Sequence, residues 1–446
     1  MVEIKSKYNS YPAYKESGIT SILKMPTEWK LKRLKYLVTY NDDSLDENHD
    51  PDDTIKYVDI SSVDRTKGIV GVEEILFEKA PSRARRLVRS GDTIVSTVRT
   101  YLKAIAYIDQ RSANFVVSTG FAVLRPRESE IDSRFLGYLI NDERLIGDIV
   151  SNSDGVSYPA INPSVLVGLY CFQPTIKEQQ SIANFLDQKT AQIDALIEQK
   201  EILLELLTEK RTAIITQAVT KGLDPNVKMK DSGIVWLGEV PEHWDVCLMK
   251  YKCNISYGIG GEIDRTLKEG YSLLSLPNIN KDGTLKLDDI GFVEIDEREK
   301  KSLILEKGDL LFNWRNGSSD HLGKTAYFDL EGEYFHASFL LKLRFDKTKD
   351  NPRFYQFALN GFQITGFFAS SKAGVNNTFN MNELSNLWIT VPPKEEQDSI
   401  ARYIVERTRK LDEVKAEIVT AIDRLKEYRS SLITTAVTGQ IDVRTQ

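Results

Sequence analysis

The sequence predicts an α+β protein in which two similar strand-rich domains are separated by a pair of long antiparallel helices that form a coiled coil. Three observations predict this fold class. A long amphipathic helical pattern occurs twice, a Pro-x-x-Trp segment opens each of two strand-rich regions, and both halves of the 446-residue chain keep nearly the same spacing. Together these observations indicate an internal repeat with a pseudo-two-fold axis.

The helical pattern runs from about Glu178 to Val219 and again from Glu396 to Val437. In both copies apolar residues recur at steps of three and four, which places them on one face of a helix. A helix of this length, about 60 Å, needs a partner for that face, and the other copy is the obvious partner. The predicted seam of the helix pair consists of Ile182, Leu186, Ile193, Leu203, Leu204, Leu207, Ile400, Ile404, Leu411, Ile422, Leu425 and Leu432.

The ends of the two helices also correspond. Thr175 and Glu178 have the spacing of a capping box, and Pro393 suits a first helical turn. Gly222 and Gly439 follow the last periodic residues, as is typical of a helix stop. The expected division is a first strand-rich domain at 1–174, the first helix at 175–221, a second strand-rich domain at 222–392, and the second helix with a tail at 393–446.

Within the strand-rich regions the sequences differ, but their turns correspond. The Pro-x-x-Trp segments end at Trp29 and Trp244. A Gly-Asp turn ending at Asp92 or Asp309 then precedes an apolar run, which predicts a buried strand. Later in each half, a helical pattern begins with Arg-Phe, and a Gly-Val pair marks a loop before the last short strand.

Composition limits the classes of function. Hydrophobic residues make up 41% and charged residues 28% of the chain, and no run approaches the roughly 20 apolar residues of a membrane span. Cys171, Cys247 and Cys253 form neither a disulfide framework nor a zinc motif. We therefore expect a protein of the reducing cytoplasm without a structural metal.

Catalytic motifs are approached but not met. The loop at 317–325 has five residues between its glycines where a P-loop has four, and the glycines at 258–261 lack the third member of a dinucleotide fingerprint. Asn351-Pro352-Arg353-Phe354 lacks the second proline of an amino-methyltransferase motif, so it is interpreted as a helix start. The four histidines are scattered, which favours a protein that positions other molecules.

Basic residues cluster locally although the net charge is −6. Lysines, arginines and tyrosines interleave between positions 79 and 111, a pattern typical of phosphate contact. In the second half, arginine and asparagine follow the Gly-Asp strand, and these side chains can read base edges. For any single arginine a solvated surface charge remains the alternative. The predicted DNA-binding residues are Arg83, Arg85, Arg86, Arg89, Arg99, Tyr101, Lys103, Trp314, Arg315, Asn316 and Lys324.

Both helices open with the pattern Pro-x-x-x-Glu-Gln-x-x-Ile-Ala, beginning at Pro174 and Pro392. With the duplicated Pro-x-x-Trp segments and the diverged strand-rich regions, this pattern closely resembles the specificity (S) subunit of Type I restriction-modification enzymes. The resemblance covers essentially the whole chain.

The resemblance implies that each strand-rich region is a target recognition domain that reads one half of a bipartite site in double-stranded DNA. The helices would hold these domains about one turn of DNA apart, of order 34 Å. They would also dock two adenine-specific DNA methyltransferase (M) subunits, which restriction/translocase (R) subunits join. Catalysis, with S-adenosylmethionine, ATP and magnesium, would then belong to the partners, and this chain would carry no cofactor.

Two alternatives remain at this point. A coiled-coil adaptor that joins proteins without touching DNA would have the same helices, but it would show no steep loss of DNA affinity with salt. A self-contained enzyme would transfer methyl groups without partners, which the absence of catalytic motifs disfavours.

Overall fold

The computed structural model describes residues 7–19, 22–260, 269–280, 282–315, 321–370 and 378–444. The chain divides into two compact units. Unit 1 comprises Met1–Lys200 with Val419–Gln446, and unit 2 comprises Glu201–Ile418. The predicted Asn316 and the loop at Gly374-Val375 lie outside the described residues.

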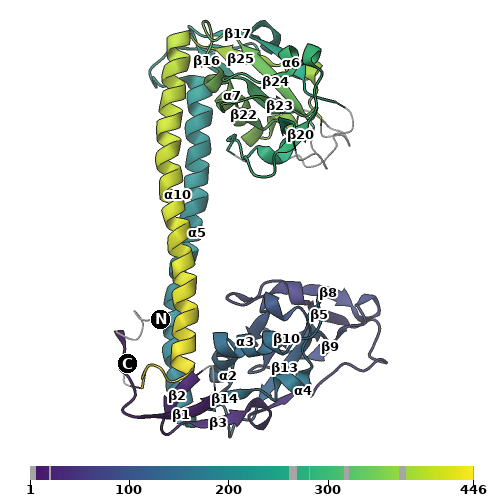
Figure 1. Cartoon of the computed structure of the whole chain (residues 1–446). Coiled ribbons are helices and arrows are strands. Elements are labelled where there is room, and N and C mark those ends of the chain that lie inside the picture. The colour runs from purple at the N-terminus through teal and green to yellow at the C-terminus, as the bar shows by residue number, and fades with distance from the viewer. Residues whose placement is uncertain are drawn as a thin grey trace. The chain divides into compact units, whose positions relative to one another are not determined.

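Unit 1 contains two four-stranded sheets (Figure 1). The first has the order β11 (Ile105–Tyr107), β10 (Thr93–Ser96), β13 (Phe121–Pro126), β4 (Val38–Tyr40), and the second has the order β8 (Glu73–Leu76), β5 (Thr54–Val58), β12 (Val116–Ser118), β9 (Ala84–Leu87). Two-stranded pairs join β1 (Tyr14–Ile19) to β2 (Ile22–Pro26), β3 (Lys30–Arg33) to β14 (Tyr170–Gln173), and β6 (Val63–Asp64) to β7 (Gly68–Ile69). Its short helices are α2 (Ser133–Ile140), α3 (Glu143–Ser151) and α4 (Pro163–Leu166).

Unit 2 repeats this topology. Its four-stranded sheet has the order β18 (Cys253–Tyr257), β24 (Leu340–Phe345), β21 (Leu310–Asn313), β22 (Thr325–Tyr327), and a three-stranded sheet has the order β20 (Gly291–Val293), β19 (Tyr271–Leu274), β23 (Tyr334–His336). The pairs are β15 (Met229–Asp231) with β16 (Glu239–Pro241), and β17 (Asp245–Leu248) with β25 (Trp388–Val391). Its short helices are α6 (Glu297–Leu303), α7 (Pro352–Ile364), α8 (Phe367–Ser370) and α9 (Met381–Ser385).

The predicted buried strands are confirmed at β10 and β21, in which every residue is buried. The helix expected at Asn351-Pro352 is also confirmed, because α7 begins at Pro352 and the Asn351 side chain caps it. One element distinguishes the units. Strand β9 extends the second sheet of unit 1, and no strand occupies the matching edge among the described residues of unit 2.

The two long helices are α5 (Ile176–Lys221) and α10 (Lys394–Val437), which lie side by side in Figure 1. In unit 2 Lys415 Nζ donates to Thr208 Oγ1 at 3.0 Å, and Arg211 lies 3.6 Å from Asp412. Residue numbers therefore decrease along α10 in the direction in which they increase along α5, so the helices are antiparallel. This pairing and the two similar strand-rich units confirm the predicted fold class.

Most of the predicted seam is buried, but the prediction that Leu203 belongs to the seam is wrong. Seven residues of the seam are at most 6% exposed: Ile182, Leu186, Ile193, Ile400, Ile404, Ile422 and Leu432. Leu204, Leu207, Leu411 and Leu425 are half-buried, because two helices alone cover each other only in part. Leu203 is 42% exposed. The seam follows Ile197, Leu204 and Leu207. Because each residue rotates the helix by about 100°, the side chain of Leu203 points away from the seam when that of Leu204 faces it.

Candidate nucleic-acid interface

In the first turn of each long helix a glutamate binds the Pro-x-x-Trp segment of its own unit, and it is buried in unit 1 and half-buried in unit 2. In unit 1 Trp29 Nε1 donates to Glu178 at 3.0 Å and the Tyr11 hydroxyl donates to Glu178 at 2.8 Å. In unit 2 Trp244 Nε1 donates to Glu396 at 3.0 Å. The expected capping box is only half formed. Thr175 Oγ1 accepts from the Glu178 amide at 3.4 Å, whereas the Glu178 carboxylate is bound to Trp29 and Tyr11.

A second pair of buried contacts fixes the Gly-Asp turn before the central strand. Arg125 on β13 binds Asp92 through two nitrogens at 3.0 and 2.8 Å, and Arg344 on β24 binds Asp309 at 2.8 and 2.6 Å. Both aspartates are 1% exposed. The two-point geometry holds the aspartate and raises the pKa of each arginine. This fork orients strands β10 and β21, whose C-terminal ends lead to exposed loops.

In unit 1 two loops distant in the sequence join at this strand end, and we call them the tip loops of unit 1 (97–103 and 152–161). The Ile161 amide donates to the Thr97 carbonyl at 2.9 Å, and the Arg99 amide donates to the Pro159 carbonyl at 2.7 Å. The side chains of Thr100 and Ser153 are hydrogen-bonded at 2.8 Å. Backbone bonds therefore hold the two loops as one rigid edge.

Aromatic and apolar side chains stand exposed on these tip loops. Arg99 has a φ of 52°, and its guanidinium lies 4.6 Å from the centre of the Tyr158 ring. Tyr158 is 59%, Tyr101 52% and Leu102 51% exposed. Exposed aromatic rings beside an arginine can stack on bases and contact phosphates. Sequence reasoning missed Tyr158, and the signal that could have found it was its place beside the expected Gly155-Val156 loop.

Unit 2 has the same loop junction, defined here as its tip loops (314–315 and 378–379). The Phe379 amide donates to the Trp314 carbonyl at 2.7 Å, the counterpart of the Ile161 bond in unit 1. Arg315 is exposed, with its guanidinium 5.9 Å from the Phe339 ring centre. Trp314 is half-buried and donates through Nε1 to the Ser338 carbonyl at 2.6 Å. Trp314 therefore supports the junction, whereas Arg315 is presented to solvent.

Two of the predicted DNA-binding residues are bound within the sheets: Lys324 is buried, so that prediction is wrong, and Arg86 is half-buried. Lys324 is only 8% exposed, because it follows Gly323 into the buried strand β22. Arg86 donates to Asn41 Oδ1 at 2.7 Å and to the Phe121 carbonyl. Burial lowers the pKa of Arg86. Both side chains support the sheets of their own unit instead of forming a surface.

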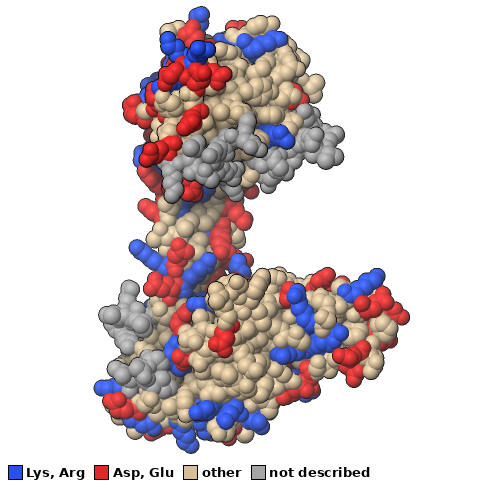
Figure 2. All heavy atoms as spheres, turned by 45° about the vertical axis from the view of Figure 1, so that its right-hand side comes forward, with Lys and Arg blue, Asp and Glu red and all other residues tan. Residues whose placement is uncertain are grey.

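The other basic residues of the 79–111 segment reach the surface but have partners within the chain. Arg83 lies 2.9 Å from Asp59, Arg89 2.8 Å from Asp43, and Lys103 3.2 Å from Glu143. Arg85 packs over the Phe77 ring at 4.8 Å. Figure 2 shows basic and acidic side chains interspersed over the visible faces of both units. The basic surface is therefore a set of small clusters, and the structure does not bring the predicted residues into one patch.

Across the described parts of the chain, no three His, Cys, Asp or Glu side chains are placed to hold a metal ion. Burial raises the pKa of the Cys171 thiol to about 12. No helix in the described ranges is both long and apolar enough to cross a membrane.

Comparisons with known proteins agree with this architecture. The chain matches the family described as "Type I restriction modification DNA specificity domain" over residues 26–206 and 269–423. It is 25% identical over 329 residues to the Type I restriction enzyme StySPI specificity subunit of Salmonella potsdam, covering 71% of this chain and 67% of that protein.

Two solved structures share the fold. A chain from a study of complex assembly and conformational transition of the type I R-M system has a TM-score of 0.74 at 21% identity, covering 94% of this chain and 100% of that chain. The HsdS subunit from Thermoanaerobacter tengcongensis has a TM-score of 0.51 at 22% identity, covering 94% of this chain and 98% of that subunit. Because the family match spans both strand-rich regions and most of both helices, the chain belongs to the family of non-catalytic DNA specificity subunits of Type I restriction-modification systems.

Proposed function

We propose that this chain reads a bipartite double-stranded DNA target, with the tip loops of each unit contacting one half. The observation that carries the proposal is a repeated internal frame that ends in two different exposed loop junctions. If both loop junctions contacted the same ligand, their exposed residues would be expected to match. They differ instead, with Arg99 and Tyr158 in unit 1 and Arg315 in unit 2.

The side chains at the tips suit direct contact with DNA. Arginine forms bidentate bonds to guanine, and stacked rings tolerate any base. Four basic residues of unit 1 are proposed to contact phosphates: Arg83, Arg85, Arg89 and Lys103. Such contacts position the protein without reading the sequence. On binding, phosphates would replace the carboxylate partners of Arg83, Arg89 and Lys103, so part of the electrostatic gain is offset.

The finer domain assignment follows from this proposal. Residues 1–174 and 222–392 would be the two target recognition domains, and 175–221 and 393–446 the scaffold that sets their separation. We further propose that the helices dock two methyltransferase subunits and that restriction/translocase subunits join this core in the cytoplasm. S-adenosylmethionine, ATP and magnesium would bind those partners.

Reconstitution tests the proposal. The purified chain mixed with its cognate methyltransferase subunit should direct methylation to one split sequence, whereas either protein alone should not. Methylation at random sites would contradict the proposal. DNA affinity should also fall steeply as salt rises, because phosphate contacts release counterions. An affinity independent of salt would favour a protein-joining adaptor.

A single substitution tests the tip of unit 2. Arg315→Ala should relax specificity at one position of the target, at a cost of about 1 to 3 kcal/mol if the contact is bidentate. Arg298→Ala is the matched control, because Arg298 is an exposed arginine of the same unit on α6, away from the tip loops. An unchanged recognition profile in Arg315→Ala would remove Arg315 from the interface.

A further inference from the structure

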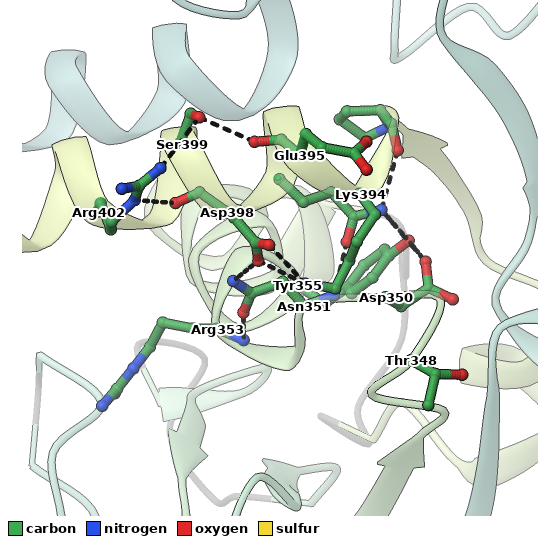
Figure 3. Close-up of polar contacts among 12 residues, drawn as sticks. Thr348, Asp350, Asn351, Arg353, Tyr355, Lys394, Glu395, Asp398, Ser399 and Arg402 are labelled. Carbon is green, nitrogen blue, oxygen red and sulfur yellow. Dashed lines mark hydrogen bonds and ion pairs between the residues drawn. The ribbon is translucent and has the colours of Figure 1, made fainter.

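Unit 2 has a groove of about 670 Å³ between strand β22, the start of α7 and the first turns of α10. Its floor includes the Tyr327 ring and the apolar residues Ala401 and Val405, of which Val405 is 46% exposed. Arg353 and Arg402 line the groove from α7 and α10, respectively. In Figure 3 the side chain of Arg353 extends away from Asp398, and Arg402 lies along α10.

The two arginines retain hydrogen-bonding capacity that the unit does not use. Arg402 contacts the Asp398 carbonyl at 3.3 Å and the Ser399 hydroxyl at 3.5 Å, both long, and it forms no ion pair with any residue that the structure describes. Arg353 lies over the Tyr327 ring at 3.7 Å, donates to Gln356 Oε1 at 3.1 Å and is 3.5 Å from Asp329. A guanidinium has five N–H donors, so each arginine can still donate hydrogen bonds to a further carboxylate.

The acidic groups of the groove, by contrast, have partners. Lys394 Nζ lies 2.6 Å from Asp398, and Lys410 Nζ lies 2.8 Å from Glu406. Arg402 is therefore the one charged side chain lining this groove that has no ion pair among the described residues, and its charge is positive. Two carboxylates nearby would still repel a polyanion such as a DNA strand.

The internal repeat supplies a template for what fits beside Arg353. Its counterpart in unit 1 is Arg134, since both follow the helix N-cap and precede phenylalanine. Arg134 binds Asp187 of α5 at 2.7 Å, and the Tyr138 hydroxyl donates to the same carboxylate at 2.8 Å. The residue of α10 that corresponds to Asp187 is Val405, 218 positions later. In unit 1 the carboxylate of Asp187 thus lies beside the arginine, whereas in unit 2 the apolar residue Val405 occupies the corresponding position.

We propose that the groove of unit 2 binds a glutamate or aspartate side chain from an acidic segment of a partner protein, held between Arg353 and Arg402. The partner carboxylate would take the position that Asp187 fills in unit 1, and the neighbouring apolar side chains would pack on Val405 and Tyr327. This proposal concerns a protein partner and does not depend on the DNA-reading function.

Fluorescence anisotropy of the full-length chain with a fluorescein-labelled 12-residue polyglutamate peptide tests the proposal, with polyglutamine of the same length as the uncharged control. Polyglutamate should bind and polyglutamine should not. Val405→Asp places a carboxylate of the chain beside Arg353 and should weaken polyglutamate binding about tenfold or more. Val405→Asn has the same shape without the charge and should leave binding close to that of the unmodified chain.

Arg402→Gln is a second variant that introduces no carboxylate, and it should also weaken binding, whereas Asp187→Asn in unit 1 should not. Thermal unfolding of each variant reports whether it is folded. Equal binding by both peptides, or unchanged polyglutamate affinity in both Val405→Asp and Arg402→Gln, would overturn the proposal. Displacement of the peptide by a 12-residue thymidylate oligonucleotide, with equal loss of both ligands in Arg402→Gln, would instead identify a phosphate site and also overturn it.

Discussion

Units 1 and 2 are two versions of one design, and they differ mainly where they face solvent. Polar contacts recur at matching positions: a tryptophan donates to Glu178 or Glu396 in the first turn of the long helix, and the aspartate of a Gly-Asp turn binds an arginine on the neighbouring strand. Even the glycines of that turn, Gly91 and Gly308, share a left-handed φ of 93°. These contacts define the frame that holds the strand-rich region on its helix.

The differences lie at the edges of this frame. Strand β9 with Arg85 and Arg86 belongs to unit 1, whereas the arginine-lined groove beside Val405 belongs to unit 2. The tip loops also present different side chains. A frame shared between two copies with diverged edges is what recognition of two different ligands requires, because the fold can be kept while the contacts change.

The largest difference between equivalent positions is expected in the helix seam. Ile422 is 6% exposed, whereas Leu204, its counterpart in unit 2, is half-buried. Ile422→Asp should lower the free energy of unfolding by more than about 3 kcal/mol, because it buries an unpaired charge, and Leu204→Asp should cost less. Urea denaturation followed by circular dichroism measures both. Leu203→Asp is the control at an exposed site and should change stability by no more than about 0.5 kcal/mol. Equal costs at positions 203 and 204 would show that the seam is misplaced.

The two arginine–aspartate contacts, Arg125 with Asp92 and Arg344 with Asp309, should contribute equally to the stability of their units. Asp92→Asn and Asp309→Asn each remove the buried carboxylate of an arginine that keeps only a more exposed one, Asp43 or Glu306, and the expected cost is about 3 kcal/mol. Hydrogen–deuterium exchange should show faster exchange in β10 and β13 for the first variant and in β21 and β24 for the second. Loss of protection in both units from either single variant would mean that the units are not independent frames.

The tryptophan contacts give a smaller matched test. Trp29→Phe and Trp244→Phe remove one hydrogen bond to Glu178 or Glu396, and each should cost about 1 to 3 kcal/mol. Hydrogen exchange at the first turns of α5 and α10 measures the loss in each unit. A large effect in one unit with none in the other would contradict the equivalence of the two helix starts.

The smallest effect is a pH dependence confined to unit 1. Burial alone would raise the pKa of Glu143, but hydrogen bonds from Ser430 and Arg65 outweigh it and lower the pKa to about 2. The stabilisation is therefore complete above the ordinary value of about 4.5 and is lost as the pH falls toward 2. Relative to Glu143→Gln, the native chain should gain less than about 1 kcal/mol at pH 7 and a smaller amount at pH 3 in urea titrations. Glu74→Gln, which removes the exposed ion pair with Lys56, is the control for loss of a surface carboxylate. If the difference in the free energy of unfolding between the native chain and Glu143→Gln increased at low pH, the lowered pKa assigned to Glu143 would be refuted.

Much of the frame could be predicted from the sequence because repeats and periodicity are local signals. The helix bounds and the buried strands after Asp92 and Asp309 follow from such signals. Leu203 was misplaced because two adjacent leucines fit the stripe equally well, and only packing distinguishes them. Lys324 was misplaced because counting charge does not show that this lysine lies next to the buried start of strand β22.

The interface was harder to predict because it depends on contacts distant in the sequence. Arg99 and Tyr158 meet only because backbone bonds join two separate loops. Asp43 lies in an acidic stretch without apolar periodicity, yet it binds Arg89 and Arg125. No local pattern reports such pairings, so sequence alone could locate the basic segment but not which of its residues remain available.

The central claim is that each unit reads its own half of a split DNA target, and a domain exchange tests it most directly. The measurement is methylome sequencing of a host that expresses the chain with its partner subunits, compared with a chimera in which residues 15–150 come from a relative. The account predicts that one half of the methylated sequence changes while the other half and the spacing remain the same. A change in both halves, or a methylated sequence that is not divided, would contradict it.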